Sequence, residues 1–176
     1  GNVGNININC VTNTYTISGS VAGLATSMPG PVDTIPVLFG STAALVNGDL
    51  PVFTSAPIND GTVVQMQIVD SPYGKNCNFT NPLPDATPPV GKWATLTLNG
   101  ANISGVAINC SAQTMAAVSV TVSGMTGSGL QLVNYISVPG SNSFTDSRTI
   151  NANGTQSFMT QPEGSDYTVV VTSMPS

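Results

Sequence analysis

Few side chains in this 176-residue chain could do chemistry. There is no histidine, only 6% of the residues are charged, and the net charge is −5. The basic residues are Lys75, Lys92 and Arg148. Histidine is the commonest general base and metal ligand, and phosphate binding needs clustered lysine and arginine. The composition therefore excludes a basic nucleic-acid surface and argues against histidine-based catalysis.

Nucleophilic catalysis would require a serine or a thiolate beside Lys75 or Lys92. No Gly-x-Ser-x-Gly or Ser-x-x-Lys pattern supports such a pair, and no Asp-x-Asp-x-Asp spacing supports calcium. Glu163 and Asp166 are close in sequence, whereas most of the other acids lie in turn contexts where aspartate caps its own backbone: Asp49, Asp60, Asp70 and Asp85. We expect a protein that is not an enzyme and holds no metal or cofactor.

Trp93 is the residue best suited to binding a ligand. Leu96 and Leu98 alternate with Thr95 and Thr97, which places Trp93 on the outer face with the threonines. There it could stack on a sugar ring. The alternative, which we favour at this stage, is that a bulge near Gly91 turns the indole inward to cap the core.

The elements that must position these residues are strands. Apolar residues alternate with Thr, Ser, Asn and Gln in several segments, among them 64–68, 118–122 and 167–171, and Asn-Gly or Asp-Gly pairs punctuate them. Helical signals are scarce, with one short turn predicted over residues 41–46. The pattern predicts an all-β fold of antiparallel β-sandwich type.

An internal repeat of about 100 residues organises the chain. Ile8-Asn9-Cys10 recurs as Ile108-Asn109-Cys110, and four further matches follow in the same order. They pair residues 16–19 with 121–124, 23–24 with 129–130, 53–57 with 158–162, and 61–72 with 164–175. These matches predict that Tyr15, Phe53, Phe158 and Tyr167 all lie in cores.

The repeat divides the chain into residues 1–10, the closing strand of a preceding unit or a tag-derived start, unit one at 11–110, and unit two at 111–176. Unit two stops where its equivalent of Cys77 should come, which predicts that it is incomplete. A natural end with a degenerate half-repeat is the alternative. A Pro-rich insertion at 27–36 in unit one has no counterpart in unit two and reads as a loop.

Residues 15–24, Tyr-Thr-Ile-Ser-Gly-Ser-Val-Ala-Gly-Leu, begin an ordered set of motifs. A Phe-x-x-x-Pro segment follows, then Pro72-Tyr73-Gly74-Lys75-Asn76-Cys77 and the closing Val106-Ala107-Ile108-Asn109-Cys110. The set resembles the tandem Ig-like β-sandwich repeat of bacterial surface and secreted proteins. The resemblance implies Ig-like sandwich units and brings no catalytic site with it.

We therefore expect a structural or adhesion module, secreted or in the cell envelope, that spaces or presents something else. A carbohydrate-binding module that uses Trp93 is the alternative. Its partners would be neighbouring repeats and a protein or glycan surface. No apolar run approaches the roughly 18 residues that span a bilayer.

The three cysteines leave at least one unpaired. Cys77 opens one strand and Cys110 closes the next in the same unit, so a disulfide between them is geometrically reasonable, with Cys10 left over. Three reduced thiols, or a Cys10–Cys77 bond, remain alternatives.

Residues 3–10 resemble a spare closing strand, because Ile6 and Ile8 match Val106 and Ile108. Unit two lacks its own closing strands, and an open sheet edge recruits strands. We expect this segment to be held by strand pairing, in its own chain or in a neighbouring copy; pairing with unit one, or no pairing, is the alternative.

Overall fold

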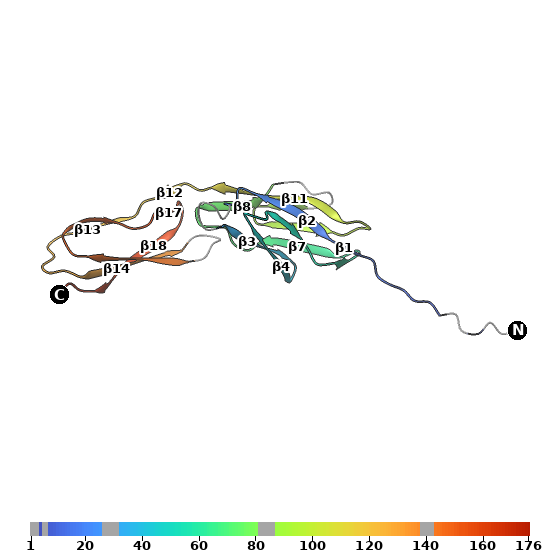
Figure 1. Ribbon diagram of the computed structural model, residues 1–176, viewed down its shortest axis with the longest axis horizontal. Coiled ribbons are helices and arrows are strands. Elements are labelled where there is room, and N and C mark those ends of the chain that lie inside the picture. The colour runs from blue at the N-terminus through green and yellow to red at the C-terminus, as the bar shows by residue number, and fades with distance from the viewer. Residues whose placement is uncertain (1–3, 5–6, 26–31, 81–86, 138–142) are drawn as a thin grey trace.

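The computed structural model describes residues 4, 7–25, 32–80, 87–137 and 143–176, with side chains described for all of these except 87–90 and 144. Every regular element in this part of the chain is a β-strand, and none is a helix. Two separate clusters of buried hydrophobic residues define an N-terminal lobe, residues 14–112, and a C-terminal lobe, residues 115–173. Figure 1 shows the lobes end to end.

Two main sheets and a short strand pair build the N-terminal lobe. One sheet has the order β5 (Val52–Thr54), β2 (Ile17–Ala22), β11 (Ile103–Ala112), β8 (Lys75–Phe79). The other has the order β4 (Thr42–Asn47), β3 (Thr34–Phe39), β7 (Val63–Ile68), β10 (Trp93–Thr97), β9 (Thr87–Val90). β1 (Thr14–Tyr15) pairs with β6 (Ile58–Asn59). Alternate residues of both sheets enter one core, which is compatible with a β-sandwich.

β2 and β11 are parallel neighbours in an otherwise antiparallel arrangement. Ile17 lies opposite Ile103, and residues 19–22 lie opposite 106–109. Two glycines let the strands approach closely. A Cβ added to Gly19 would lie 2.1 Å from the Val106 carbonyl oxygen, and one added to Gly23 would lie 2.0 Å from that of Cys110. The first and last long strands of this lobe are therefore bonded side by side.

The C-terminal lobe repeats the first part of this plan. β12 (Met115–Ala116) pairs with β17 (Gln161–Pro162), and β13 (Ser119–Val122) pairs with β16 (Gly154–Ser157). A three-stranded sheet has the order β15 (Phe144–Ile150), β14 (Leu130–Ser137), β18 (Asp166–Ser173). These pairings correspond to β1–β6, β2–β5 and β4–β3–β7. Among the described residues, nothing corresponds to β8, β9, β10 or β11.

Strand pairing corrects three of the five matches in the repeat alignment. Phe158 N donates to Val118 O just as Ser55 N donates to Ile17 O, and Glu163 N donates to Thr114 O as Asp60 N does to Asn13 O. Residues 14–24 therefore correspond to 115–125, so Gly23 matches Gly124. The sequence match of 16–19 with 121–124 was four residues out of register, because Thr, Val, Ser and Gly recur throughout β13 and its flanks. The matches of 23–24 with 129–130 and of 53–57 with 158–162 were out by five and two residues, since Ser55 corresponds to Phe158.

Three further expectations are corrected. Residues 42–47 form strand β4, not a helical turn, because the whole segment pairs with β3 from Thr34↔Asn47 to Phe39↔Thr42. Within the Pro-rich insertion, residues 34–36 belong to β3, while 26–31 lie outside the described residues. Tyr167, expected in a core, is 55% exposed because β14 is the one described strand that pairs with β18, whose other side has no described neighbour.

A short, bonded connection joins the lobes. β11 ends at Ala112 and β12 begins at Met115, so only two residues separate the strands. Gln113 N donates a 2.8 Å hydrogen bond to Gly74 O, and the Tyr73 hydroxyl of the N-terminal lobe donates to Thr160 O of the C-terminal lobe. Burial, followed by the negative charge of Asp146, raises the pKa of Tyr73. The junction is thus fixed by contacts from both lobes.

Candidate functional site

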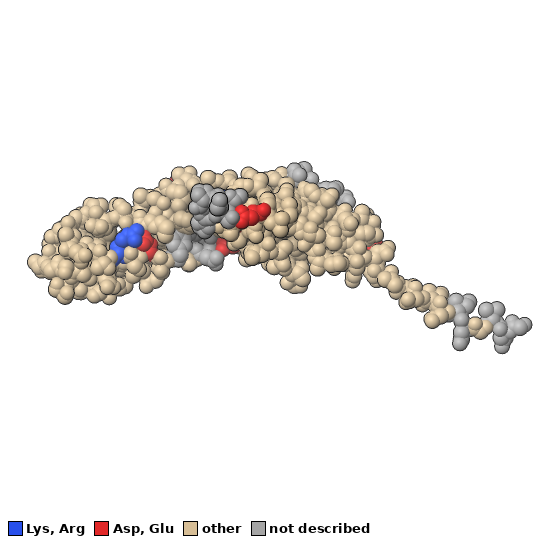
Figure 2. All heavy atoms as spheres, in the orientation of Figure 1, with Lys and Arg blue, Asp and Glu red and all other residues tan. Residues whose placement is uncertain are grey.

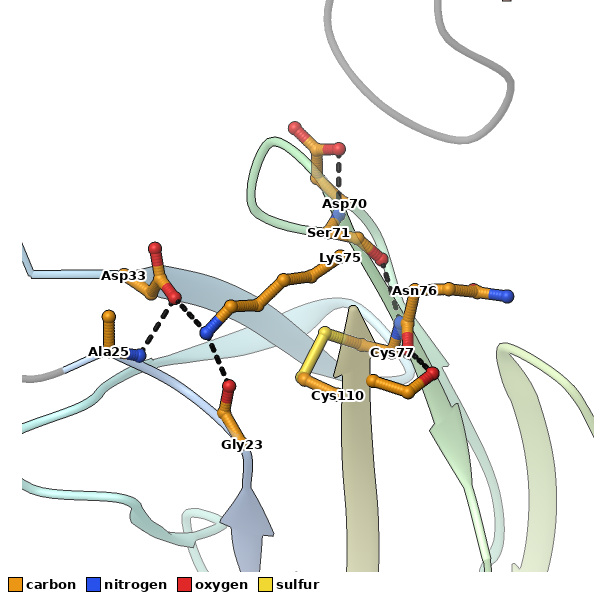
Figure 3. Close-up of a disulfide and its surroundings, with 10 residues drawn as sticks. Gly23, Ala25, Asp33, Asp70, Ser71, Lys75, Asn76, Cys77 and Cys110 are labelled. Atoms are coloured by element: carbon orange, nitrogen blue, oxygen red, sulfur yellow. Dashed lines mark hydrogen bonds and ion pairs between the residues drawn. A yellow bond between two sulfur atoms is a disulfide. The ribbon is translucent and has the colours of Figure 1, made fainter. Parts of the chain in front are cut away.

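The disulfide joins Cys77 to Cys110 (Figure 3), and Cys110 lies two residues before β11 ends at the junction. The two residues lie opposite each other on β8 and β11, and both are buried. Ser71 Oγ accepts a hydrogen bond from Cys77 N at 3.2 Å. Cys10 is free and exposed. The bond covalently ties the last strand of the lobe to its neighbour.

Beside the disulfide, one lysine links three segments of the chain (Figure 3). Lys75 Nζ lies 2.6 Å from Asp33 Oδ2 and also donates to Gly23 O. Asp33 Oδ2 in turn accepts the backbone N–H of Ala25 at 2.8 Å. Both charged side chains are only partly exposed. They join the end of β2 to the segments that precede β3 and begin β8, so their arrangement is that of a structural clasp.

The second ion pair lies inside the C-terminal lobe. The Asp146 carboxylate is buried, accepts Met159 N at 2.6 Å, and pairs with Arg148 at 2.7 Å. Arg148 also donates to Ser157 O and lies 5.9 Å from the centre of the Phe158 ring. Each polar group holds β15 against the β16–β17 connection. Figure 2 shows how few charged atoms reach the visible face of the molecule.

Trp93 lies on the outer face of the N-terminal lobe, which overturns the inward position we favoured. Its side chain is 50% exposed, whereas Ala94 and Leu96 are buried. β10 keeps regular register with β7 from Trp93↔Gln67 to Thr97↔Val63, and a register shift occurs instead in its pairing with β9, between Trp93 and Thr95. The regular pairing with β7 fixes the direction of the indole. Trp93, Gln67 and Thr95 therefore share one solvent-facing surface.

Next to Trp93, burial lowers the pKa of Lys92, and the Asp70 carboxylate opposes that shift. The indole thus has a cation adjacent in sequence and amide side chains across the strand. This surface is suited to stacking and hydrogen bonding.

A buried amide in the C-terminal lobe was not singled out from the sequence. Asn134 is 0% exposed, and neither of its side-chain polar atoms has a hydrogen-bond partner among the described residues. It lies opposite Asp146 and Val169 as Phe39 lies opposite Thr42 and Met66. The sequence could have predicted that Asn134 is buried, because the alternation of Leu130, Leu132 and Ile136 places residue 134 in the core.

Replacing Asn134 by leucine should raise the free energy of unfolding of the C-terminal lobe by about 1–3 kcal/mol, because a buried amide without partners costs roughly that much. Urea denaturation of the full chain measures the change. Asn109→Leu, at an exposed position on β11, is the matched control and should shift stability by less than about 0.5 kcal/mol. A loss of stability in Asn134→Leu would contradict this assignment.

No group of three or more Cys, Asp or Glu side chains that could hold a metal ion occurs in the described part of the chain. The described residues also include no helix of the length and apolarity needed to cross a bilayer. Comparison with protein-family models, with curated proteins and with solved structures finds no match to this chain.

Proposed function

We propose that the chain is a non-catalytic structural module of an exported bacterial surface protein, built from tandem Ig-like β-sandwich units, the second of them incomplete, and acting as a spacer or interaction domain. The observation that carries this proposal is the parallel pairing of β2 with β11. These are the long strands through which the chain enters and leaves the N-terminal lobe.

Pulling on the two ends of this lobe loads that pair in shear. The chain enters β2 at its Ile17 end and leaves β11 at its Ala112 end. Because the strands run in the same direction, tension draws them past each other along their length. The hydrogen bonds opposite residues 19–22 must then fail together. Such a pair resists tension far better than one whose bonds open singly.

The surrounding structure supports the same role. The Cys77–Cys110 bond fastens the exit strand to β8 just before the junction. Two linking residues and the two hydrogen bonds of Gln113 and Tyr73 connect the lobes, which limits bending between them. A disulfide persists in oxidising compartments such as the periplasm and the extracellular space, which supports export.

Stretching single molecules by their termini tests this function. The C-terminal lobe should unfold first and at lower force, because its entry strand β13 and exit strand β18 share no pairing among the described residues. Reductant identifies the unfolding step of the N-terminal lobe. Breaking the disulfide should increase the extension gained in that step by about 120 Å, since the bond spans 33 positions and each extended residue contributes about 3.6 Å. Equal unfolding forces for the two lobes would contradict a mechanical role for the β2–β11 pair.

A carbohydrate-binding module is the second candidate, and the half-exposed Trp93 beside Gln67 is the observation that favours it. An indole on a flat β surface offers an apolar plane to a sugar ring, and neighbouring amides can bind its hydroxyls. Binding would then occur on the five-stranded sheet of the N-terminal lobe.

If this second function is correct, a glycan array should retain the chain, and Trp93→Ala should weaken binding about tenfold or more, because an aromatic contact adds about 0.5–1.5 kcal/mol beyond its buried area. Tyr135→Ala, at another half-exposed aromatic residue, is the matched control and should bind normally. Absence of glycan binding, or equal binding by Trp93→Ala, would reject the module and leave the structural role unaffected.

A further inference from the structure

The C-terminal lobe has an open groove where the N-terminal lobe has its closing strands. A depression of about 490 Å³ lies between β13 and β18, and it is lined in part by Val118, Val120, Gln161, Tyr167 and Val169. Gln161 is 3% exposed, yet its Oε1 has no hydrogen-bond partner among the described residues. The groove therefore combines apolar walls with an unused buried acceptor.

Exposure of the inner face of β18 shows what the groove lacks. In β7, Val64 is 5% exposed and Ile68 is 0% exposed. The corresponding Tyr167 and Val171 of β18 are 55% and 53% exposed. Both strands have their first neighbour, β3 or β14, so the difference comes from the remaining strands. These apolar side chains would be buried if the groove were filled.

The two corresponding glycines locate the space for an incoming strand. At Gly23 an added Cβ would meet the backbone of Cys110 on β11, at 2.0 Å. Gly124 has the same left-handed conformation, with φ of 70°, but an added Cβ would have nothing within 4 Å. The site beside β13 that corresponds to β11 is thus unobstructed at this position.

A segment with the sequence of β11 is available on the same chain. Residues 7–10 are exposed and belong to no strand, and Ile8 is 77% exposed. Their Ile8-Asn9-Cys10 repeats Ile108-Asn109-Cys110, of which the isoleucine and the cysteine are buried in β11. As a strand, residues 7–10 would direct Ile8 and Cys10 to one face and both asparagines to the other.

We propose that residues 7–10 of a second copy of this chain bind as a strand parallel to β13, in the place that β11 takes beside β2. The register of β2 with β11 then puts Ile8 opposite Val122 and Cys10 opposite Gly124. Val120 stands where the N-terminal lobe has Gly19, so pairing is confined to residues 121–124. The Ile8 side chain enters the groove and covers its apolar wall.

The donor must be another molecule. Cys10 is four residues from Thr14, the start of β1, so it lies within about 14 Å of that strand even when fully extended. Figure 1 shows the N-terminal segment leaving the N-terminal lobe at the end opposite the C-terminal lobe. β11 alone, with 10 residues, spans about 33 Å of the intervening lobe. Such a head-to-tail contact is heterologous and generates open chains or rings.

Sedimentation velocity of the full chain, in a Cys10→Ser background that prevents intermolecular disulfides, tests the proposal. The sedimentation coefficient should rise with protein concentration. Ile8→Asp should abolish the rise, whereas Val11→Asp, an equal charge change at a residue 82% exposed in the same segment, should leave it intact. Asn tolerates positive φ better than other side chains, so Gly124→Asn should block the incoming strand without unfolding the lobe.

Gly129→Asn is the control for Gly124→Asn, because Gly129 has φ of 85° and equally open surroundings. Circular dichroism checks that each variant is folded. Hydrogen exchange adds an independent reading: β13 amides should gain protection with concentration in the parent chain but not in Gly124→Asn. Absence of association, or association that persists in Ile8→Asp and Gly124→Asn and so uses another edge such as β18, would overturn the proposal. Either result leaves the proposed mechanical role of β2 and β11 untouched.

Discussion

Removing the Cys77–Cys110 bond should lower the free energy of unfolding of the N-terminal lobe by about 3–4 kcal/mol, the chain-entropy value for a loop of this size. The bond closes a segment of 33 positions and lies inside the core, so the native state keeps its packing while the unfolded state gains freedom. Urea denaturation with and without reductant measures the effect, and a Cys77→Ala, Cys110→Ala double variant should reproduce it.

Two controls test whether the loss of stability comes from the Cys77–Cys110 bond. Cys10→Ser should have no effect on either lobe, because Cys10 is exposed and unbonded. The C-terminal lobe should unfold at the same urea concentration in oxidised and reduced protein, since it contains no cysteine. Equal stability of the N-terminal lobe in both redox states would show that the bond does not constrain its unfolded chain.

Substituting Gly23 by alanine should destabilise the N-terminal lobe by about 3–5 kcal/mol, through backbone strain together with steric overlap. Its φ is 83°, and an added Cβ would lie 2.0 Å from the Cys110 carbonyl oxygen, a backbone atom that cannot move without shifting β11. Gly124→Ala introduces the same backbone strain at positive φ but no steric overlap. It should therefore lower the free energy of unfolding of the C-terminal lobe by only about 1–2 kcal/mol. Thermal unfolding of both variants measures the difference; similar losses would mean that β11 does not pack against Gly23.

Much of the fold could be predicted because side-chain alternation records which face of a strand is buried. Val64, Met66 and Ile68 alternate in sequence and are buried in β7. The Cys77–Cys110 bond was also expected, because both residues belong to one unit. The reasoning from strand order was wrong, since Cys77 lies in the middle of β8, and β9 and β10 come between β8 and β11 in the chain. The alternation depends only on local spacing, which a sequence contains.

The errors arose where distant strands decide the outcome. Tyr167 matches a core residue by spacing, but its exposure depends on the strands that surround β18 beyond its described neighbour β14. Trp93 faces outward because β10 keeps its register with β7. The expected inward position considered only a local bulge near Gly91 and not this pairing. Residues 42–47 are a strand because β3 pairs with them. Repeat register failed for a different reason, since a low-complexity Thr, Val, Ser and Gly composition matches itself at several offsets.

The N-terminal segment shows the same limit. Its sequence predicts a closing strand, and we expected strand pairing, yet its described residues pair with nothing in their own chain. Composition and spacing identify what the segment can do, while chain geometry excludes the partner it could have used in the same molecule. Pairing in a neighbouring copy therefore stays a prediction.

The direction of pulling tests the central claim most directly, because the β2–β11 pair should resist force along the strands and yield to force that separates them at one end. In a Cys10→Ser background, handles attached through Asn13→Cys and Gln113→Cys load the pair in shear. Handles at Asn13→Cys and Ala101→Cys pull on the two strand beginnings, which lie at the same end of the parallel pair, and open it one bond at a time. The N-terminal lobe should unfold at clearly higher force with the first pair of handles than with the second. Equal forces in the two geometries would contradict the mechanical role proposed for this chain.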